Sequence, residues 1–201
     1  MYLPASFRVD DEPQARGLIQ DHPFATVVTP TPEQLWVSHV PMLARPGAPL
    51  VLAGHVARAN GHWRAMGAGA PTTAIFHGPH AYVSPTWYTT SPAVPTWNYA
   101  VVHATGSVAL LEDEASALES LSTLSEAFEG PAPEAWRTAG LRRSLVGAIV
   151  AFELRVERIE AKLKLGQNRS PADRLGVIAR LEADGDETSR ALAAHMRATL
   201  R

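Results

Sequence analysis

Short runs rich in β-branched and aromatic residues, bounded by proline or glycine, dominate the first 111 positions and predict a series of strands. The runs are residues 24–29, 35–40, 50–53, 72–76 and 97–111. The first two are joined by Thr31-Pro32-Glu33 and read as a hairpin. Gly106 lies inside the last run and is expected to mark a bulge or sharp bend.

Helical spacing of apolar residues appears mainly outside these runs. Asp10-Asp11-Glu12-Pro13 predicts the start of an amphipathic helix that ends near Asp21. Residues 115–128 form the clearest helix, with Leu118, Leu121, Leu124 and Phe128 on one stripe. Shorter helices are expected within residues 56–66 and around Trp136.

The last third combines one strand with a helical tail. Phe152, Leu154 and Val156 alternate with charged residues within 146–159, which indicates a half-buried strand. From Pro171 the pattern turns helical, with a turn at residues 184–186. We therefore expect a mainly β chain with flanking helices: a small antiparallel barrel over 1–169 and a helical tail over 170–201. The absence of βαβ alternation argues against a doubly wound nucleotide fold.

The segment from Phe76 to Tyr99 concentrates rings and prolines. It holds six of the fourteen aromatic residues and four of the sixteen prolines, and Pro-Thr-Trp occurs in it twice. Proline removes backbone donors and favours extended geometry before it, so we expect a strand at 81–84, a rigid loop, and a new strand from Trp97. These residues would form a flat aromatic surface at one end of the sheet.

No Asp or Glu occurs between Glu33 and Glu112, whereas this interval carries Arg45, Arg58, Arg64 and six histidines. Such a segment suits a planar ligand with an anionic tail, because rings lie on aromatic surface while cations and N–H groups bind phosphate. A sheet core, where carboxylates are rare, gives the same composition.

Length and composition bound the remaining possibilities. The 201 residues suffice for one domain with a helical appendage. A net charge of −2 argues against a general binder of nucleic acid or membrane surfaces, and the lack of cysteine excludes thiolate sites and disulfides. No apolar run reaches a membrane-spanning length and no signal peptide is evident, so a cytoplasmic protein is expected.

The signatures of serine hydrolases, P-loop proteins, dinucleotide-binding folds and zinc proteases are absent from the sequence. An all-histidine zinc or iron site could combine His77 and His80 with His39, His55 or His103, although this spacing is unspecific. Axial ligation of haem by two of these histidines is a further alternative.

Two segments are better candidates for binding a phosphate. Ser38-His39 and Gly54 to Asn60 are each expected to end a strand, and Arg58 follows a glycine in the second. A phosphate there would meet a guanidinium and the N–H groups of a new helical turn. Lys162 to Arg169 adds amides and cations at the end of the last strand.

These residues resemble the PaiB family of FMN-binding split-barrel proteins over nearly the whole chain. The matching motifs are Met1-Tyr2 with Pro4 and Phe7, 22–25, 38–41, 54–60 with Trp63, 78–88, 94–99 and 164–168. The resemblance implies a homodimer that encloses FMN at its interface.

Carried over by position, the resemblance assigns three sets of FMN-binding residues. Ser38, His39, Val40 and Pro41 would line the flavin, while His55, Arg58 and Asn60 would hold its phosphate and ribityl chain. Trp97, Asn98 and Tyr99 would face the ring, and Gln167 and Asn168 would reach it from the last strand. The chain departs from the family at Gly166, where the family usually has serine.

The resemblance implies a flavin-linked regulator of transcription, since the family is named for negative regulation. A flavin reductase-like oxidoreductase and a haem-binding split barrel are the alternatives, the latter with His55 and His39 as first ligand candidates. The tail from Ser170 has five arginines and five carboxylates, so it offers DNA no net positive charge. DNA binding is thus expected to be indirect or absent, and no catalytic acid/base pair is expected.

Overall fold

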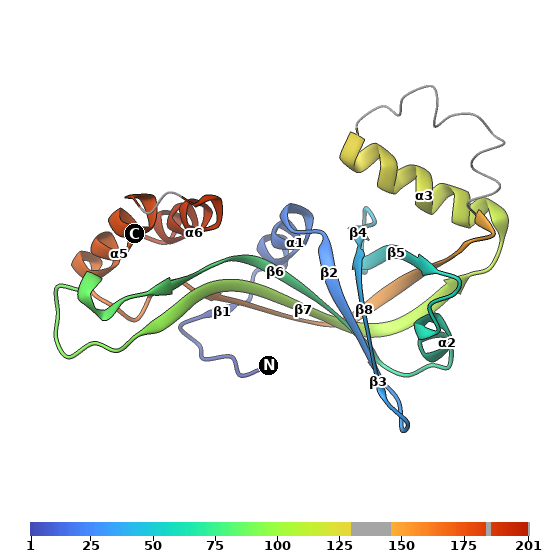
Figure 1. The fold of residues 1–201 in the computed structure, drawn as a ribbon, viewed down its shortest axis with the longest axis horizontal. Coiled ribbons are helices and arrows are strands. Elements are labelled where there is room, and N and C mark those ends of the chain that lie inside the picture. Colours follow the sequence, from blue (N-terminus) through green and yellow to red (C-terminus); the bar gives the residue numbers. More distant parts are fainter. Residues whose placement is uncertain (130–145, 184–185, 201) are drawn as a thin grey trace. The chain divides into compact units, whose positions relative to one another are not determined.

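The computed structural model describes residues 1–129, 146–183 and 186–200. Within these ranges the chain forms eight strands, five α-helices and one 3₁₀ helix (Figure 1). Neighbouring strands follow the order β3-β2-β6-β7-β8-β5-β4, and β1 pairs with β8. The observed pairings of β1, β2, β4 and β5 are antiparallel. The mainly β prediction is confirmed, but among the described residues the path is open at β3 and β4, so the sheet is not a closed barrel.

The chain divides into two compact units. Unit 1 comprises Met1–Leu18, His77–Val102 and Glu160–Arg201, and unit 2 comprises Ile19–Phe76 and His103–Ile159. Three long strands contribute residues to both units: β6 (Thr72–Val83), β7 (Thr96–Leu111) and β8 (Ile149–Lys164). The predicted boundary at residue 169 does not coincide with this division and stays a prediction.

The sheet of unit 2 is built on the predicted hairpin. β2 (Phe24–Pro30) and β3 (Leu35–Pro41) pair along their whole length, and Thr31 N donates to Gln34 O in the turn (2.9 Å). β2 also pairs with Thr73–Phe76 of β6. Side chains alternate between the two faces of β2, and those on one face are buried. Together with residues of β6 they form a core that includes Val27 and Phe76.

The second half of unit 2 forms around β5 (Val51–Ala57). This strand pairs with Ile149–Arg155 of β8 and with β4 (Leu43–Ala44). α3 (Glu114–Glu129) contacts β5, and the Arg45 guanidinium joins Glu119 of α3 (2.8 Å) to Glu153 of β8 (2.9 Å). In the predicted stripe of α3, Leu118, Leu121 and Leu124 are half-buried and Phe128 is exposed. The buried residues of this helix are Ala117 and Ser120.

Unit 1 contains β1 (Arg8–Val9), the 3₁₀ helix η1 (Pro85–Trp87) and the two tail helices. α5 (Pro171–Ala183) and α6 (Glu187–Ala198) pack against each other, as the sequence predicts, and Ile178, Leu181, Leu192 and Met196 are buried. α5 also contacts η1. α1 (Glu12–Asp21) contains residues of both units and confirms the predicted N-terminal helix.

An aspartate ties the proline-rich loop after η1 to α5. The Asp173 carboxylate accepts hydrogen bonds from the backbone N–H and hydroxyl of Thr89 (both 2.7 Å) and of Thr90 (3.0 and 2.6 Å). These bonds, led by the Thr90 and Thr89 hydroxyls, hold the pKa of Asp173 well below its ordinary value. The carboxylate is thus fully committed to this loop.

Two sequence predictions need correction here. The strands expected at 72–76 and 81–84 form one continuous β6. Pro79 is tolerated in it because the pairing with β2 ends at Phe76, so this edge needs no donor from residue 79. The helix expected within 56–66 is α2 (His62–Gly67), since residues 56 and 57 belong to β5. The helix expected around Trp136 lies outside the described residues.

Gly106 is required by a close approach of two backbones. A Cβ added at this position would lie 1.9 Å from Arg155 O on β8. Gly106→Ala is therefore expected to lower the free energy of unfolding by about 3 kcal/mol, since β8 would have to shift.

Urea unfolding monitored by circular dichroism measures this loss. Gly17→Ala is the matched control, because an added Cβ at residue 17 meets nothing within 4 Å and alanine favours helix α1. Equal stability of the two variants would contradict the assignment.

Candidate functional site

The predicted binding residues divide between the two units. Unit 2 holds Ser38, His39, Val40, Pro41, His55, Arg58 and Asn60. Unit 1 holds Trp97, Asn98, Tyr99, Gln167 and Asn168. Each set has its own hydrogen bonds and surroundings.

In unit 2, Ser38 and Asn60 join a buried polar network that we call the His62 cluster: Thr29, Ser38, Asn60, His62 and Thr72. Asn60 Nδ2 donates to Ser38 Oγ (2.9 Å), which also bonds His62 Nδ1 (2.8 Å). On the other side of the imidazole, His62 Nε2 bonds Thr29 Oγ1 (2.9 Å), which bonds Thr72 Oγ1 (2.8 Å). The network links β2, β3, β6 and α2.

The bonds of the His62 cluster are all satisfied with a neutral imidazole. With Thr72 donating to Ala70 O (3.4 Å), its hydroxyl accepts from Thr29, and Thr29 accepts from His62 Nε2–H. His62 Nδ1 is then left to accept the Ser38 hydroxyl proton. This arrangement needs a neutral imidazole, and burial lowers the pKa of His62 in agreement.

His39 lies on the opposite face of β3 from Ser38 and is exposed. Its Nδ1 bonds Thr26 Oγ1 (3.1 Å), and its ring stacks with Phe24 at 6.4 Å between centroids. Ser38 and His39 therefore lie inside β3 and not at its end, which corrects the sequence prediction. Only alternate residues of Ser38–Pro41 can face one ligand.

His55 is the least satisfied of the predicted residues. Its Nδ1 atom is buried without a hydrogen-bond partner in the described part of the chain. Burial lowers the pKa of its imidazole, which favours the neutral form. A buried nitrogen of this kind is stabilised when a ligand supplies the missing hydrogen bond.

Arg58 is exposed and anchors the start of β8. Its Nε donates to Gly147 O and its Nη2 to Ile149 O, both at 2.8 Å. The backbone amides expected to be available nearby are used, because Gly54–Ala57 pair with β8 and Arg58 N donates to Ala148 O (2.8 Å). These amides are therefore not available to a phosphate, whereas a turn does follow β5 at residues 58–59 and the Nη1 group of Arg58 can bind an anion.

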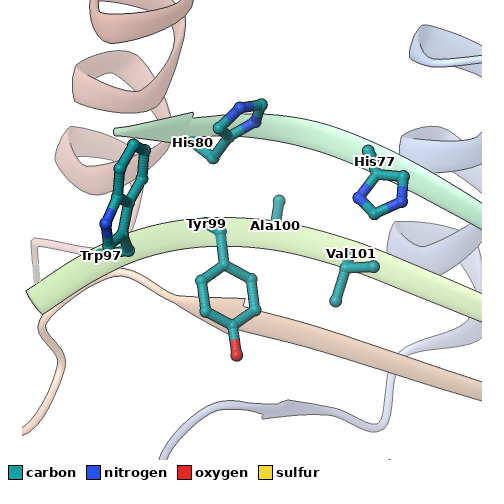
Figure 2. Close-up of a pocket in the computed structure, with 6 residues that line it drawn as sticks. All are labelled: His77, His80, Trp97, Tyr99, Ala100 and Val101. Carbon is teal, nitrogen blue, oxygen red and sulfur yellow. The ribbon is translucent and has the colours of Figure 1, made fainter. Parts of the chain in front are cut away.

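In unit 1, Trp97 and Tyr99 line an aromatic cavity of about 290 Å³. Figure 2 shows its lining residues: His77 and His80 on β6, and Trp97, Tyr99, Ala100 and Val101 on β7. The Trp97 ring is 54% exposed and contacts the rings of His80 and Tyr82, each at 6.2 Å between centroids. No carboxylate lines this cavity.

Asn98 and Gln167 have structural partners within unit 1. Asn98 is buried, and its Nδ2 lies 3.7 Å from Met196 Sδ. Gln167 stabilises the turn after β8 with two hydrogen bonds: its Oε1 accepts from Leu165 N (2.8 Å) and its Nε2 donates to Leu163 O (2.6 Å). Asn168 is exposed. Gly166 adopts a φ of +76°, a conformation that favours glycine over the serine usual in the family.

Sequence reasoning missed several residues beside these sets. Thr29, His62 and Thr72 were given no role, although Ser, Thr, Asn and His side chains on neighbouring elements are the residues from which buried networks form. Lys162 was also given no separate role. It is buried, donates to Tyr2 O (3.0 Å), and lies 5.4 Å from the Tyr99 ring centroid.

The described residues contain no group of three or more His, Cys, Asp or Glu side chains that could hold a metal ion. Helices long and apolar enough to cross a membrane are likewise absent from residues 1–129, 146–183 and 186–200.

Comparison with known proteins places this geometry in a family. Residues 1–158 match the family model described as "Putative FMN-binding domain". This chain belongs to that FMN-binding family. It is 33% identical over 198 residues to the Protease synthase and sporulation protein PAI 2 of Bacillus subtilis, an alignment that covers 96% of this chain and 95% of that protein. The resemblance to the PaiB family is thereby confirmed, and FMN is the cofactor.

Two solved structures show the same fold at low sequence identity. The flavocytochrome Anf3 of Azotobacter vinelandii matches with a TM-score of 0.64 and 15% identity, over 78% of this chain and 68% of that one. The FAD and heme binding protein of Mycobacterium smegmatis also has a TM-score of 0.64, with 19% identity over 89% and 80% of the two chains. The split-barrel fold class is therefore confirmed.

The side chains present fit a flavin. FMN needs apolar surface for its ring, donors and acceptors for the ring edge, and cations or N–H groups for its phosphate. The half-exposed Trp97, the unpartnered His55 Nδ1 and the remaining Arg58 donors provide each type of group.

Stability should depend on pH through the two buried histidines. The unfolded state takes up protons at His55 and His62 below the ordinary imidazole pKa of about 6.5, whereas burial keeps both neutral in the folded state. The free energy of unfolding is therefore expected to fall as pH drops below about 6.5.

Urea unfolding between pH 5 and pH 8 tests this expectation. His62→Gln should make the slope of stability against pH shallower. Ser38→Ala should cost about 1–3 kcal/mol, because Asn60 and His62 lose a buried partner. An unchanged slope in His62→Gln would contradict a neutral, buried His62.

Proposed function

We propose that this chain is a homodimeric flavoprotein that presents its FMN to a small electron donor or acceptor, as a flavin reductase-like oxidoreductase does. The aromatic cavity beside Trp97 is the observation that carries this proposal. A half-exposed ring that is flanked by His80 and Tyr82, in a cavity whose lining has no carboxylate, suits a planar ligand.

The exposed face of the β2–β3 hairpin supports the homodimer. Leu35 and Val37 are 61% and 48% exposed near the turn of the hairpin, and Phe24 is 65% exposed at its other end, opposite Pro41. Apolar surface of this kind on a sheet face marks an interaction site. The PaiB resemblance implies that a second copy covers it.

The proposed FMN contacts follow the two sets of predicted residues. His55, Arg58 and Asn60 would hold the phosphate and ribityl chain, with His55 Nδ1 and the Arg58 guanidinium as the strongest polar contacts, and alternate residues of Ser38–Pro41 would line the flavin. Trp97, Asn98, Tyr99, Gln167 and Asn168 would border the ring. FMN when bound would supply hydride and one-electron transfer, and these side chains would orient it.

Flavin-linked regulation of transcription is the second candidate. It is supported by the name of the Bacillus subtilis relative, which refers to protease synthesis and sporulation. The tail helices do not favour direct DNA binding, because their apolar faces are buried in unit 1. Regulation would then act through a partner of the protein.

One pair of assays separates these candidates. The oxidoreductase predicts that FMN-loaded protein oxidises NADH or NADPH faster than the same concentration of free FMN. The regulator predicts salt-sensitive binding that prefers promoter fragments over random DNA. Absence of turnover together with a promoter preference would overturn the first candidate in favour of the second.

Arg58→Ala tests the phosphate contact. If Arg58 meets the phosphate, the variant should bind FMN more weakly by about 1.5–3 kcal/mol and bind riboflavin, which has no phosphate, as the wild type does. Equilibrium quenching of flavin fluorescence measures both affinities.

Arg64→Ala is the matched control, since Arg64 is an exposed arginine that lies over the Trp63 ring at 4.5 Å. Equal losses for FMN and riboflavin in Arg58→Ala would mean that the mutation acts through the fold at Gly147 and Ile149.

A further inference from the structure

A second cavity of unit 1 has a different chemical character from the aromatic one. It measures about 140 Å³, and its polar lining residues are Tyr88, Thr96, Asn98, Lys164, Asn168 and Arg169. Two of these side chains are cations, two are amides, and none is a carboxylate. A cavity of this size and lining suits a small anion.

Lys164 is a half-buried cation with only neutral partners. Its Nζ donates to Thr96 Oγ1 and to Trp97 O (2.7 Å), which leaves one N–H of the ammonium for another acceptor. No carboxylate pairs with it in the part of the chain that the structure describes. Burial and the neighbouring Lys162 lower the pKa of Lys164, which means that its surroundings disfavour the charged form, and an anion in the cavity would favour it.

Arg169 supplies the second positive charge and is held in place by its surroundings. Its guanidinium lies 4.7 Å from the centroid of the Tyr88 ring, and its backbone N–H donates to Gly166 O (2.9 Å). The Thr89 and Thr90 bonds to Asp173 fix the loop that carries Tyr88. The Lys164–Arg169 pair is therefore positioned before any ligand arrives.

A third cation, Arg174, lies next to a residue that lines the cavity. Arg174 is buried, with an exposed fraction of 8%. It lies next to Gly166, where an added Cβ would be 3.8 Å from Arg174 Cγ. Its Nε atom has no hydrogen-bond partner among the described residues. The adjacent carboxylate, Asp173, is committed to Thr89 and Thr90 and does not pair with it.

We propose that the cavity between Lys164 and Arg169 binds a small oxyanion, a phosphate or a carboxylate group. The ammonium and guanidinium neutralise its charge, while Thr96, Asn98 and Asn168 offer neutral hydrogen bonds. Gly166 lines the same cavity and adds no side chain to fill it. The oxyanion is either the phosphate of the flavin or a group on a separate molecule.

Inorganic phosphate and sulfate are the first probes, and thermal unfolding at constant ionic strength is the first readout. Either anion should raise the Tm of the wild type relative to chloride, because it binds only the folded state. Lys164→Met and Arg169→Gln should abolish this shift. Arg180→Gln, which removes an exposed arginine of α5, should keep it.

Flavin binding then identifies the source of the oxyanion. If the cavity holds the flavin phosphate, Lys164→Met should weaken FMN binding about tenfold or more, leave riboflavin unchanged, and FMN should suppress the phosphate shift in the wild type. If a separate molecule supplies the group, FMN-saturated wild type should retain the phosphate shift and Lys164→Met should bind FMN normally.

The proposal is overturned if phosphate and sulfate leave the Tm of the wild type unchanged and both variants bind FMN as the wild type does. If Lys164→Met does not fold, the phosphate-induced Tm shift and the FMN affinity of Arg169→Gln decide the question. This outcome is distinct from failure of the proposed function, since normal FMN binding and turnover would persist.

Discussion

The hydrogen bonding of β8 is the constraint on which the rest of the structure depends. Its first half pairs with β5, which fixes the backbone at His55 and gives Arg58 the carbonyls of Gly147 and Ile149 as anchors. Its second half pairs with β1 and presents Lys162 and Lys164 beside the rings of unit 1. β7, which carries Trp97 and Tyr99, neighbours β8, whereas β3, which carries Ser38, joins the sheet through β2 and β6.

Charge distribution explains why this fold suits an anionic, planar ligand. The stretch between Glu33 and Glu112 contributes aromatic and imidazole side chains but no carboxylate. Unit 1 adds buried or half-buried cations at Lys162, Lys164 and Arg174, whose partners are carbonyls, hydroxyls and aromatic rings. Such cations are costly without a counter-ion, so a bound anionic ligand would stabilise the arrangement.

Local signals predicted the elements well, and long-range pairing decided what they missed. Proline punctuation and alternation correctly gave the β2–β3 hairpin, and helical spacing gave α1, α3 and the tail helices. The continuous β6 could not be predicted, because tolerance of Pro79 depends on where β2 stops pairing. The His62 cluster also needs the fold, since Thr29, Ser38 and Thr72 meet His62 from three different strands. The motif resemblance predicted the cofactor, whereas the contacts of Arg58 and Gln167 became visible only in the structure.

Titration of the purified protein with FMN, followed by flavin fluorescence and visible absorption, tests the central claim most directly. The account predicts saturable quenching with one FMN bound per chain and a flavin absorption spectrum that persists after gel filtration. No quenching, or a haem Soret band that does not respond to FMN, would contradict it.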